Sequence, residues 1–479
     1  MTSNLKKKAI SGVVWTLSER FGMQGIQFVI GVILARLLSP CDYGLIGMIT
    51  VFFVVAGVFV QSGFGMAYVQ KKNVTDLDAN TVFYTNLLSS IVLYFCIWII
   101  APSIARFYNQ PVLIHLTRVT GIVVIINAFN IIQTAQLTRD VDFKRSTRVI
   151  LISTLFSGVS GMTAAYMGMG VWSLVIQQLS NRFLTTVGLW FTSQWRPGLQ
   201  FSLQSYRSLF SFGVWVLAAD ILRAVFDNIY ILTIGKFFPV AQLGYYTNAK
   251  KLQKMASEEI AGSIGRVAFP VLAKMQENKF ELKNGARKFL KYTMFITVPI
   301  MVTLIVVAKP FVLLMLTEKW APMTPYIQLL CIVGLLFPIH LINVKLLQAQ
   351  GRSNLNFKIA AIKNLLRISN IAIIYRFGVI FIILGEVVLS FIALLINTHY
   401  TKQLADYGVI EQFKDIGFIF SAGALACLSG YVVTCYISNL YINFCVGLLA
   451  TISGYLFFQY VLNRQFLNEI LKLKEVFTR

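Results

Sequence analysis

The sequence predicts an all-α integral membrane protein with about fourteen transmembrane helices. Of its 479 residues, 57% are hydrophobic and only 13% are charged, whereas a soluble domain has about a quarter charged residues. The mean hydropathy is +0.71. Apolar stretches long enough to cross a bilayer recur along the whole chain. The connections between them are too short for a separate soluble domain, so the length of the chain is explained by membrane helices.

The first apolar stretch, residues 12–35, is predicted to be a membrane helix and not a cleaved signal peptide. Lys6, Lys7 and Lys8 precede it, but it is too long for the apolar part of a signal peptide and lacks a small-residue cleavage site. Thirteen further stretches have the length of membrane helices, and all of them are apolar except residues 244–270, which contain the polar sequence AKKLQKMASEEI. The expected helices are 12–35, 44–66, 82–102, 113–137, 149–167, 171–191, 211–235, 244–270, 292–308, 326–349, 359–375, 379–396, 416–436 and 443–462.

The distribution of lysine and arginine predicts the orientation of the chain. Cytoplasmic loops of membrane proteins are enriched in both residues. With a cytoplasmic N-terminus, 25 lysines and arginines, including the cluster at 274–291, fall in inside connections and six fall outside. This arrangement requires an even number of helices, which is why the polar helix 244–270 is included. The sequence thus predicts a multi-pass protein of the bacterial cytoplasmic (inner) membrane with both termini in the cytoplasm. The net charge of +23 is attributed to these loops, and we expect no nucleic-acid partner.

No enzymatic or metal-binding motif is found in the sequence. The six cysteines are scattered, without a CxxC pair or a zinc-ligand spacing. There is no Walker A loop, no HExxH and no GxSxG in a strand–turn–helix context. We therefore expect a transporter without cofactor or metal, driven by an ion gradient or by downstream consumption of its substrate.

A short phrase is repeated 200 residues apart, as ARLLSPCDYG at 35–44 and GKFFPVAQLG at 235–244. Six helices separate the copies, so both have the same orientation, which is typical of a parallel repeat. The predicted organisation is an N-terminal lobe (1–210, helices 1–6), a C-terminal lobe (211–400, helices 7–12) around a central cavity, and a C-terminal segment (401–479, helices 13–14 and a cytoplasmic tail). Chance similarity between two loops is the alternative.

Polar residues form one stripe on the first helix of each predicted lobe, as helical spacing shows. They are Arg20, Gln24 and Gln27 in the first helix and Asp220, Arg223 and Asp227 in the seventh. The 200-residue offset places the two stripes at the same depth. Two such helices facing each other would line a polar cleft. The alternative is that Asp220, Arg223 and Asp227 neutralise one another within their own helix.

Other charges inside the predicted membrane helices are candidates for substrate binding, because an intramembrane charge is costly and usually functional. Arg118 and Arg182 have no acidic neighbour in their own helices and are the clearest cavity candidates. Lys250 and Lys254 share a face, although pairing with a nearby glutamate would also explain them. Glu386 is the single acid of an apolar helix and is a candidate for ion coupling. The excess of basic residues favours an anionic substrate, and phosphate suits Arg and Lys well.

Three stretches resemble a known family. The sequence GVVWTLSERFGMQGIQFVIGVILARLLSPCDYGLIGM (12–48) is similar to the start of polysaccharide exporters of the multidrug/oligosaccharidyl-lipid/polysaccharide (MOP) superfamily. LGYYTNAKKLQKM (243–255) and SIGRVAFPVLAKMQ (263–276) resemble the eighth-helix region of Wzx-type flippases, in particular the colanic-acid and teichuronic-acid exporter branch. The resemblance extends over essentially the whole chain.

The resemblance implies a flippase for an undecaprenyl-pyrophosphate-linked oligosaccharide, acting in lipopolysaccharide, exopolysaccharide or capsule biosynthesis. It implies two six-helix lobes around an alternating-access cavity, with membrane lipid and the polysaccharide polymerase and glycosyltransferases of the same pathway as partners. A MATE-like ion-coupled drug or metabolite antiporter is the first alternative, although it would need an acidic cavity for cationic substrates. A membrane glycosyltransferase or ligase is the second, and it would need a longer outer loop for its catalytic residues.

Overall fold

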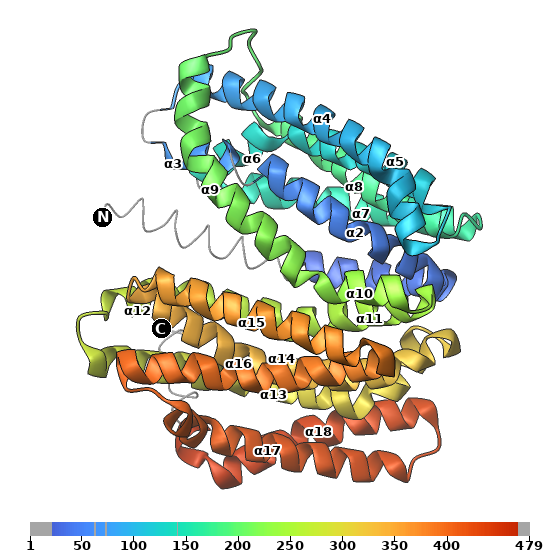
Figure 1. The fold of residues 1–479 in the computed structure, drawn as a ribbon. Coiled ribbons are helices and arrows are strands. Elements are labelled where there is room, and N and C mark those ends of the chain that lie inside the picture. The colour runs from blue at the N-terminus through green and yellow to red at the C-terminus, as the bar shows by residue number, and fades with distance from the viewer. Residues whose placement is uncertain (1–21, 62–63, 72–73, 141, 468–479) are drawn as a thin grey trace. The chain divides into compact units, whose positions relative to one another are not determined.

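The computed structural model describes residues 22–467, apart from 62–63, 72–73 and 141. Within these residues the fold is all-helical, without a β-strand (Figure 1). The chain forms two compact units, residues 1–244 and 245–479. The lobe boundaries expected at residues 210 and 400 come from the sequence repeat and stay a prediction.

Eight of the described helices are long and apolar enough to cross a membrane, or nine if one bent pair is a single span. The eight are Pro40–Val60, Asp76–Tyr108, Lys144–Tyr166, Lys279–Met315, Glu318–Ala349, Val379–Ala405, Val409–Cys435 and Leu440–Leu462. The predicted class, an all-α integral membrane protein, is confirmed. The count of fourteen membrane helices stays a prediction.

The first unit begins, in the described part of the chain, with the helix Gly22–Leu37. Its further helices are α2 (Pro40–Gln61), α3 (Phe64–Gln70), α4 (Asp76–Tyr108), α5 (Leu113–Ala128), α6 (Ile131–Arg139), α7 (Phe143–Tyr166), α8 (Val171–Thr192), α9 (Leu203–Asp227), α10 (Ile229–Phe237) and the first residues of α11 (Val240–Gln253). α7 packs along α8, and α4 packs along α5. A small buried apolar cluster of Ala56, Val60, Val124 and Ala128 joins α2 to α5.

The second unit contains the rest of α11 and a large hydrophobic core. Its elements are a π-helical turn (Lys254–Glu258), α12 (Glu259–Lys274), α13 (Lys279–Met315), a 3-10 turn (Glu318–Met323), α14 (Thr324–Ala349), α15 (Ser353–Ile374), a 3-10 turn (Tyr375–Phe377), α16 (Val379–Ala405), α17 (Val409–Cys435) and α18 (Leu440–Leu462). α13 lies in the middle of this unit, in contact with α14, α17 and α18. Leu290, Met294, Ile419 and Tyr455 are among the buried residues of the core.

Three of the predicted helices are interrupted in the structure. Residues 113–137 form α5 and α6, which are bent by 44° at residues 129–130. Residues 211–235 are divided between α9 and α10 at Asn228, whose side-chain amide donates to the Ala224 carbonyl at 2.7 Å. Residues 244–270 pass from α11 to α12 through the π-helical turn. Side chains that compete for backbone hydrogen bonds, as Asn228 does, and π turns are common causes of such breaks.

The basic cluster at 274–291 is part of a helix that extends beyond its apolar segment. α13 has 37 residues, which corresponds to about 55 Å at 1.5 Å per residue, longer than the hydrocarbon core of about 30 Å. Its polar first turns pair with α17: Arg287 Nε lies 2.7 Å from Asp415 Oδ2, and Lys283 Nζ lies 3.6 Å from Glu411 Oε1. These ion pairs join the polar ends of the two helices.

The repeated phrases contact each other in the first unit. Gly44 lies in the first turns of α2, and a Cβ atom there would overlap the carbonyl oxygen of Val240. Gly244 lies in the first turns of α11, and a Cβ atom there would overlap the carbonyl oxygen of Pro40. Residue 40 corresponds to 240 and residue 44 to 244, so the contact is reciprocal. Such reciprocity is the mark of a local two-fold axis, which supports a genuine repeat.

Candidate functional site

A polar cavity of about 520 Å³ lies inside the first unit. It is surrounded by the helix Gly22–Leu37, α3, the bent pair α5–α6, α7 and α8. Its polar lining consists of Gln27, Asn127, Asn130, Thr134, Thr138, Ser146, Thr154, Asn181, Arg182 and Thr185. Its volume is within the range of small-molecule binding sites, about 300–1,000 Å³.

The break between α5 and α6 forms one side of this cavity. A broken helix leaves backbone carbonyl groups without their usual partners, and α8 supplies replacements. The indole Nε1 of Trp190 donates to the Phe129 carbonyl at 2.7 Å, and the Thr186 hydroxyl donates to the Ile126 carbonyl at 3.2 Å. The side-chain amide of Asn130 donates to the same hydroxyl at 2.7 Å. These bonds hold the break open and fix the position of Asn130 in the cavity wall.

Arg182 is the one charged side chain among the described residues that line the cavity. Among the described residues, no carboxylate lies within 4.0 Å of its guanidinium group. Its neighbour Asn181 is held against α7, because its amide donates to the Ser157 hydroxyl at 3.1 Å. α8 is therefore fixed next to the cavity, and Arg182 lies in the cavity wall. One arginine surrounded by amides and hydroxyls can bind an anion together with hydroxyl groups.

Two of the predicted site residues, Gln27 and Arg182, line this cavity. Gln24 is half-buried in the same helix as Gln27 but is not among the lining residues. Arg20 lies outside the described residues, so the predicted cleft between the first and seventh helices stays a prediction.

Arg118 is held elsewhere in the first unit. Its guanidinium lies 3.9 Å from the centre of the Trp98 ring on α4, which is a cation–π distance. Its Nε atom is buried without a hydrogen-bond partner. This residue therefore contacts an aromatic side chain and does not line the Arg182 cavity.

The charged stripe of the seventh helix is locally paired. Arg223 Nη1 lies 3.6 Å from Asp220 Oδ1, and the Arg223 side chain is 73% exposed. Asp227 is exposed at the end of α9. Asp220 and Arg223 therefore neutralise each other within their own helix, as the alternative to a polar cleft predicted.

In the second unit Glu386 has a basic partner from another helix. Lys250 Nζ on α11 lies 2.7 Å from Glu386 Oε1 on α16, and the Tyr246 hydroxyl donates to Glu386 Oε2 at 3.3 Å. Both charged side chains are mostly buried. Lys254 is exposed in the π-helical turn. Glu386 is thus the single acid of its own helix but is neutralised across two helices.

The sequence reasoning missed the amide and hydroxyl residues of the cavity because it searched for charges. A signal was present: Asn127 and Asn130 are three residues apart in an otherwise apolar stretch. Uncharged polar residues at one helical face inside a membrane segment also need partners. Helical spacing would have placed both on one face.

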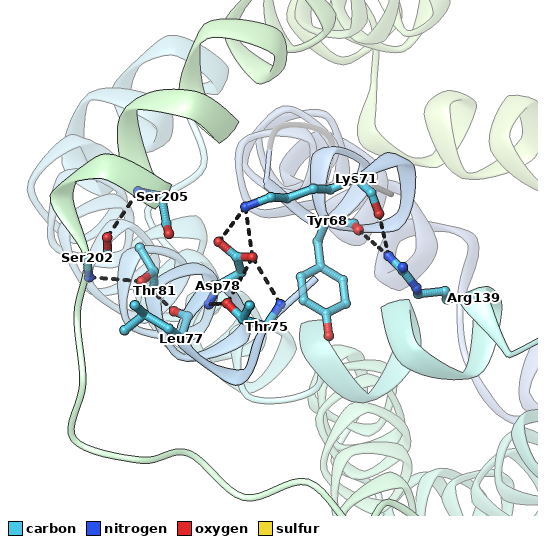
Figure 2. Close-up of polar contacts among 9 residues, drawn as sticks. All are labelled: Tyr68, Lys71, Thr75, Leu77, Asp78, Thr81, Arg139, Ser202 and Ser205. Carbon is cyan, nitrogen blue, oxygen red and sulfur yellow. Dashed lines mark hydrogen bonds and ion pairs between the residues drawn. The ribbon is translucent and has the colours of Figure 1, made fainter. Parts of the chain in front are cut away.

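A second polar cluster lies where α3, α4 and the start of α9 meet (Figure 2). Asp78 is almost fully buried, and both of its oxygens accept from Lys71 Nζ at 2.8 Å. The same carboxylate and Thr75 form a capping box at the start of α4. Arg139 Nη1 at the end of α6 donates to the Lys71 carbonyl at 2.6 Å. Burial raises the pKa of the nearby Tyr68 phenol, so it stays neutral and this cluster fastens α3, α4 and α6 together.

Comparison with known proteins shows relatives in the synthesis of bacterial polysaccharides. The chain is 26% identical over 356 residues to the "Teichuronic acid biosynthesis protein TuaB" of Bacillus subtilis, which covers 74% of each chain. It is 26% identical to the "Lipopolysaccharide biosynthesis protein WzxC" of Escherichia coli, over 77% of this chain and 76% of that protein. It is 22% identical to the "Succinoglycan biosynthesis transport protein ExoT" of Rhizobium meliloti, over 71% of this chain and 69% of that protein.

Solved structures show the same fold. The "Lipid II flippase MurJ, inward closed conformation" superposes with a TM-score of 0.78 at 16% identity and covers 96% of this chain and 100% of that chain. An inward-facing multidrug resistance MATE transporter of the MOP superfamily superposes with a TM-score of 0.62 at 15% identity, over 82% of this chain and 99% of that chain. The model of the family described as "Polysaccharide biosynthesis protein" matches residues 33–325. The chain therefore belongs to the polysaccharide biosynthesis protein family and has the fold of MOP-superfamily transporters.

Proposed function

We propose that this chain moves an undecaprenyl-pyrophosphate-linked oligosaccharide from the cytoplasmic to the outer leaflet of a bacterial inner membrane, by alternating access. The observation that carries the proposal is the Arg182 cavity, a polar site at a helix break among membrane-spanning helices. Sites at discontinuous membrane helices are typical of transporters. Relatives that belong to teichuronic acid, lipopolysaccharide and succinoglycan biosynthesis support this substrate class.

The chemistry of the cavity suits the polar part of such a lipid. The guanidinium of Arg182 can donate two parallel hydrogen bonds to a phosphate. The amides of Asn127, Asn130 and Asn181 are both donors and acceptors, as sugar hydroxyls require. Among the lining residues that the structure describes there is no Asp or Glu, whereas a site for cationic drugs would need one. The lining thus favours the oligosaccharide flippase over the antiporter, and the polyprenyl tail would stay in lipid.

The cytoplasmic orientation of both termini is part of the proposal. It is supported by the concentration of lysine and arginine in alternate connections. With this orientation the substrate would reach the cavity from the leaflet in which lipid-linked sugars are assembled.

The test is translocation of a fluorescent undecaprenyl-pyrophosphate disaccharide in proteoliposomes. Arg182→Ala should slow translocation at least tenfold, because a charge-assisted hydrogen bond contributes about 1.5–3 kcal/mol. Arg182→Lys should retain part of the rate, since it keeps the charge but loses the paired geometry. Arg376→Ala, which removes an exposed arginine from a 3-10 turn, is the matched control. Translocation by Arg182→Ala at the wild-type rate would contradict the role of the cavity.

A further inference from the structure

A second polar cavity, of about 830 Å³, lies on the opposite side of α6 from the Arg182 cavity. α6 separates the two, because Thr134 and Thr138 line the first cavity while Gln136 and Asp140 line the second. The remaining walls of the second cavity are the first turns of α4, Arg145 at the start of α7, the end of α8 and residues 193–200 of the extended segment 193–202 that leads to α9. In Figure 1 this segment passes close to the beginning of α4.

An apolar groove of about 590 Å³ lies next along α4. Leu87, Leu88 and Ile91 of α4 form one side, and Phe201 and Leu203 form the other. Several of these side chains are exposed: Leu88 by 65%, Phe201 by 55% and Leu203 by 56%. They belong to a predicted membrane helix and to the connection next to it, so we expect hydrocarbon to fill the groove.

The polar cavity and the apolar groove are neighbours on one helical face. Asn80 lines the cavity and Tyr84 lines the groove, and residues four apart lie one turn, about 6 Å, apart on the same face. The extended segment passes from one to the other, with Gln200 in the cavity and Phe201 in the groove.

The extended segment is fastened to α4 by two hydrogen bonds. The Gly198 amide donates to Asn80 Oδ1 at 2.9 Å, and the Ser202 amide donates to the Thr81 hydroxyl at 3.1 Å (Figure 2 shows the second). Asn80 and Thr81 are both buried. The wall shared by the cavity and the groove is thus part of the packed structure of the first unit.

The lining of the polar cavity selects against a purely anionic head group. Its two arginines are already engaged: Arg196 donates to the backbone carbonyls of Trp190 and Ser193, and Arg145 lies 3.1 Å from Asp142. The carboxylates of Asp76 and Asp140 have no ion-pair partner among the described residues. Carboxylates accept hydrogen bonds from hydroxyl groups, and amides both accept from hydroxyl groups and donate to them, so this lining suits the hydroxyl groups of a sugar.

We propose that the polar cavity and the apolar groove together form a docking site for an amphiphile with a sugar head group and a long hydrocarbon tail. The sugar lies in the polar cavity and the tail lies along α4 in the groove. This inference rests on the proposed function, in which such a glycolipid is the substrate, and adds a second binding site beside the Arg182 cavity. The occupant is a lipid-linked sugar, because a membrane phospholipid would fill the groove without a match for the polar cavity.

The experiment uses the full-length protein in nanodiscs and a polyprenyl-diphosphate disaccharide with a photoreactive diazirine near the head-group end of its tail. Adducts are expected on residues 84–91 and 201–206. Unlabelled glycolipid should displace them, and an equal concentration of sugar-free polyprenyl phosphate should not. The double variant Gln136→Ala/Asp140→Ala should reduce labelling at least fivefold by removing sugar contacts, and Leu88→Trp should do so by filling the groove. Leu428→Trp, at a 62% exposed leucine of α17, is the matched control and should label like the wild type.

Adducts spread evenly over the exposed apolar helices, or equal displacement by the sugar-free lipid, would overturn the docking site. Labelling that is unchanged in both the cavity and groove variants would overturn it as well. Translocation by the wild-type protein in proteoliposomes separates the two proposals. Specific labelling without translocation would refute the flippase and leave the docking site, whereas translocation with unspecific labelling would refute the docking site alone.

Discussion

Gly44 and Gly244 occupy equivalent positions in two copies of one phrase, and each lies against the backbone at the start of the other copy's helix. Neither position has room for a Cβ atom, because the atom that it would meet is a backbone carbonyl oxygen that cannot move by side-chain rotation. The contact between α2 and α11 therefore depends on two glycines.

Alanine at either glycine should destabilise the protein. Overpacking in a close contact costs about 1–3 kcal/mol, which exceeds the gain of about 1 kcal/mol expected from replacing glycine in a helix. Thermal unfolding of purified Gly44→Ala and Gly244→Ala measures the effect. Gly57→Ala is the control, because nothing lies within 4 Å of a Cβ atom at that position of α2, and it should be neutral or stabilising. Equal midpoints for all three variants would contradict the close contact.

The ion pair between Lys250 and Glu386 should behave as one unit. Removing one partner leaves a mostly buried charge uncompensated, at a cost of about 3 kcal/mol. The double variant Lys250→Met/Glu386→Leu should therefore be more stable than either Lys250→Met or Glu386→Leu. Unfolding measurements on the four proteins give the coupling energy. Additive effects would show that the pair is not coupled and would return Glu386 to consideration as an independent ion-coupling residue.

Arg118 and Trp98 should also be coupled in stability. A cation–π contact that is partly removed from water contributes about 1–2 kcal/mol. Arg118→Met retains much of the side-chain volume and loses the charge, and Trp98→Leu loses the ring. We expect the loss in the double variant to be smaller than the sum of the single losses. If the loss of stability in the double variant equals the sum of the two single losses, Arg118 acts independently of Trp98.

The capping box of α4 gives a further prediction. Asp78→Ala removes the acceptor of the Thr75 amide, and the loss of this cap should lower the free energy of unfolding by about 1 kcal/mol. It also leaves Lys71 without its ion-pair partner. Asp76→Ala removes an exposed acid from the same turn and should cost less, since only its interaction with the helix dipole is lost, about 0.3–1 kcal/mol. Chemical denaturation of both variants compares them. Equal losses of unfolding free energy in the two variants would show that the buried ion pair between Asp78 and Lys71 does not stabilise the protein.

The fold class followed from the sequence because a bilayer imposes length and hydropathy on every helix that crosses it. Apolar stretches such as 379–396 therefore predicted α16 directly. The break between α5 and α6 could not be predicted in the same way, since both halves are apolar and the bend depends on partners from α8. Trp190 and Thr186 lie about sixty residues away from the carbonyls that they satisfy.

The candidate site was predictable in part. Arg182 was found because a charge without a local partner is conspicuous in an apolar helix. The same reasoning selected Arg118, whose partner is an aromatic ring on another helix, and Lys250, whose partner is 136 residues away. Helical spacing shows which residues share a face. It does not show whether that face contacts a cavity, an aromatic ring or an acidic residue, because this depends on tertiary packing.

The reciprocal glycine contact also determines how mutations affect the two halves of the chain. In a dimer of half-length chains, a single glycine codon would have supplied both sides of such a contact, and one mutation would have broken it twice. In the fused chain the two codons are separate, at 44 and 244. Each side of the contact can therefore be altered alone, and a substitution at one glycine leaves the contact of the other glycine in its own sequence.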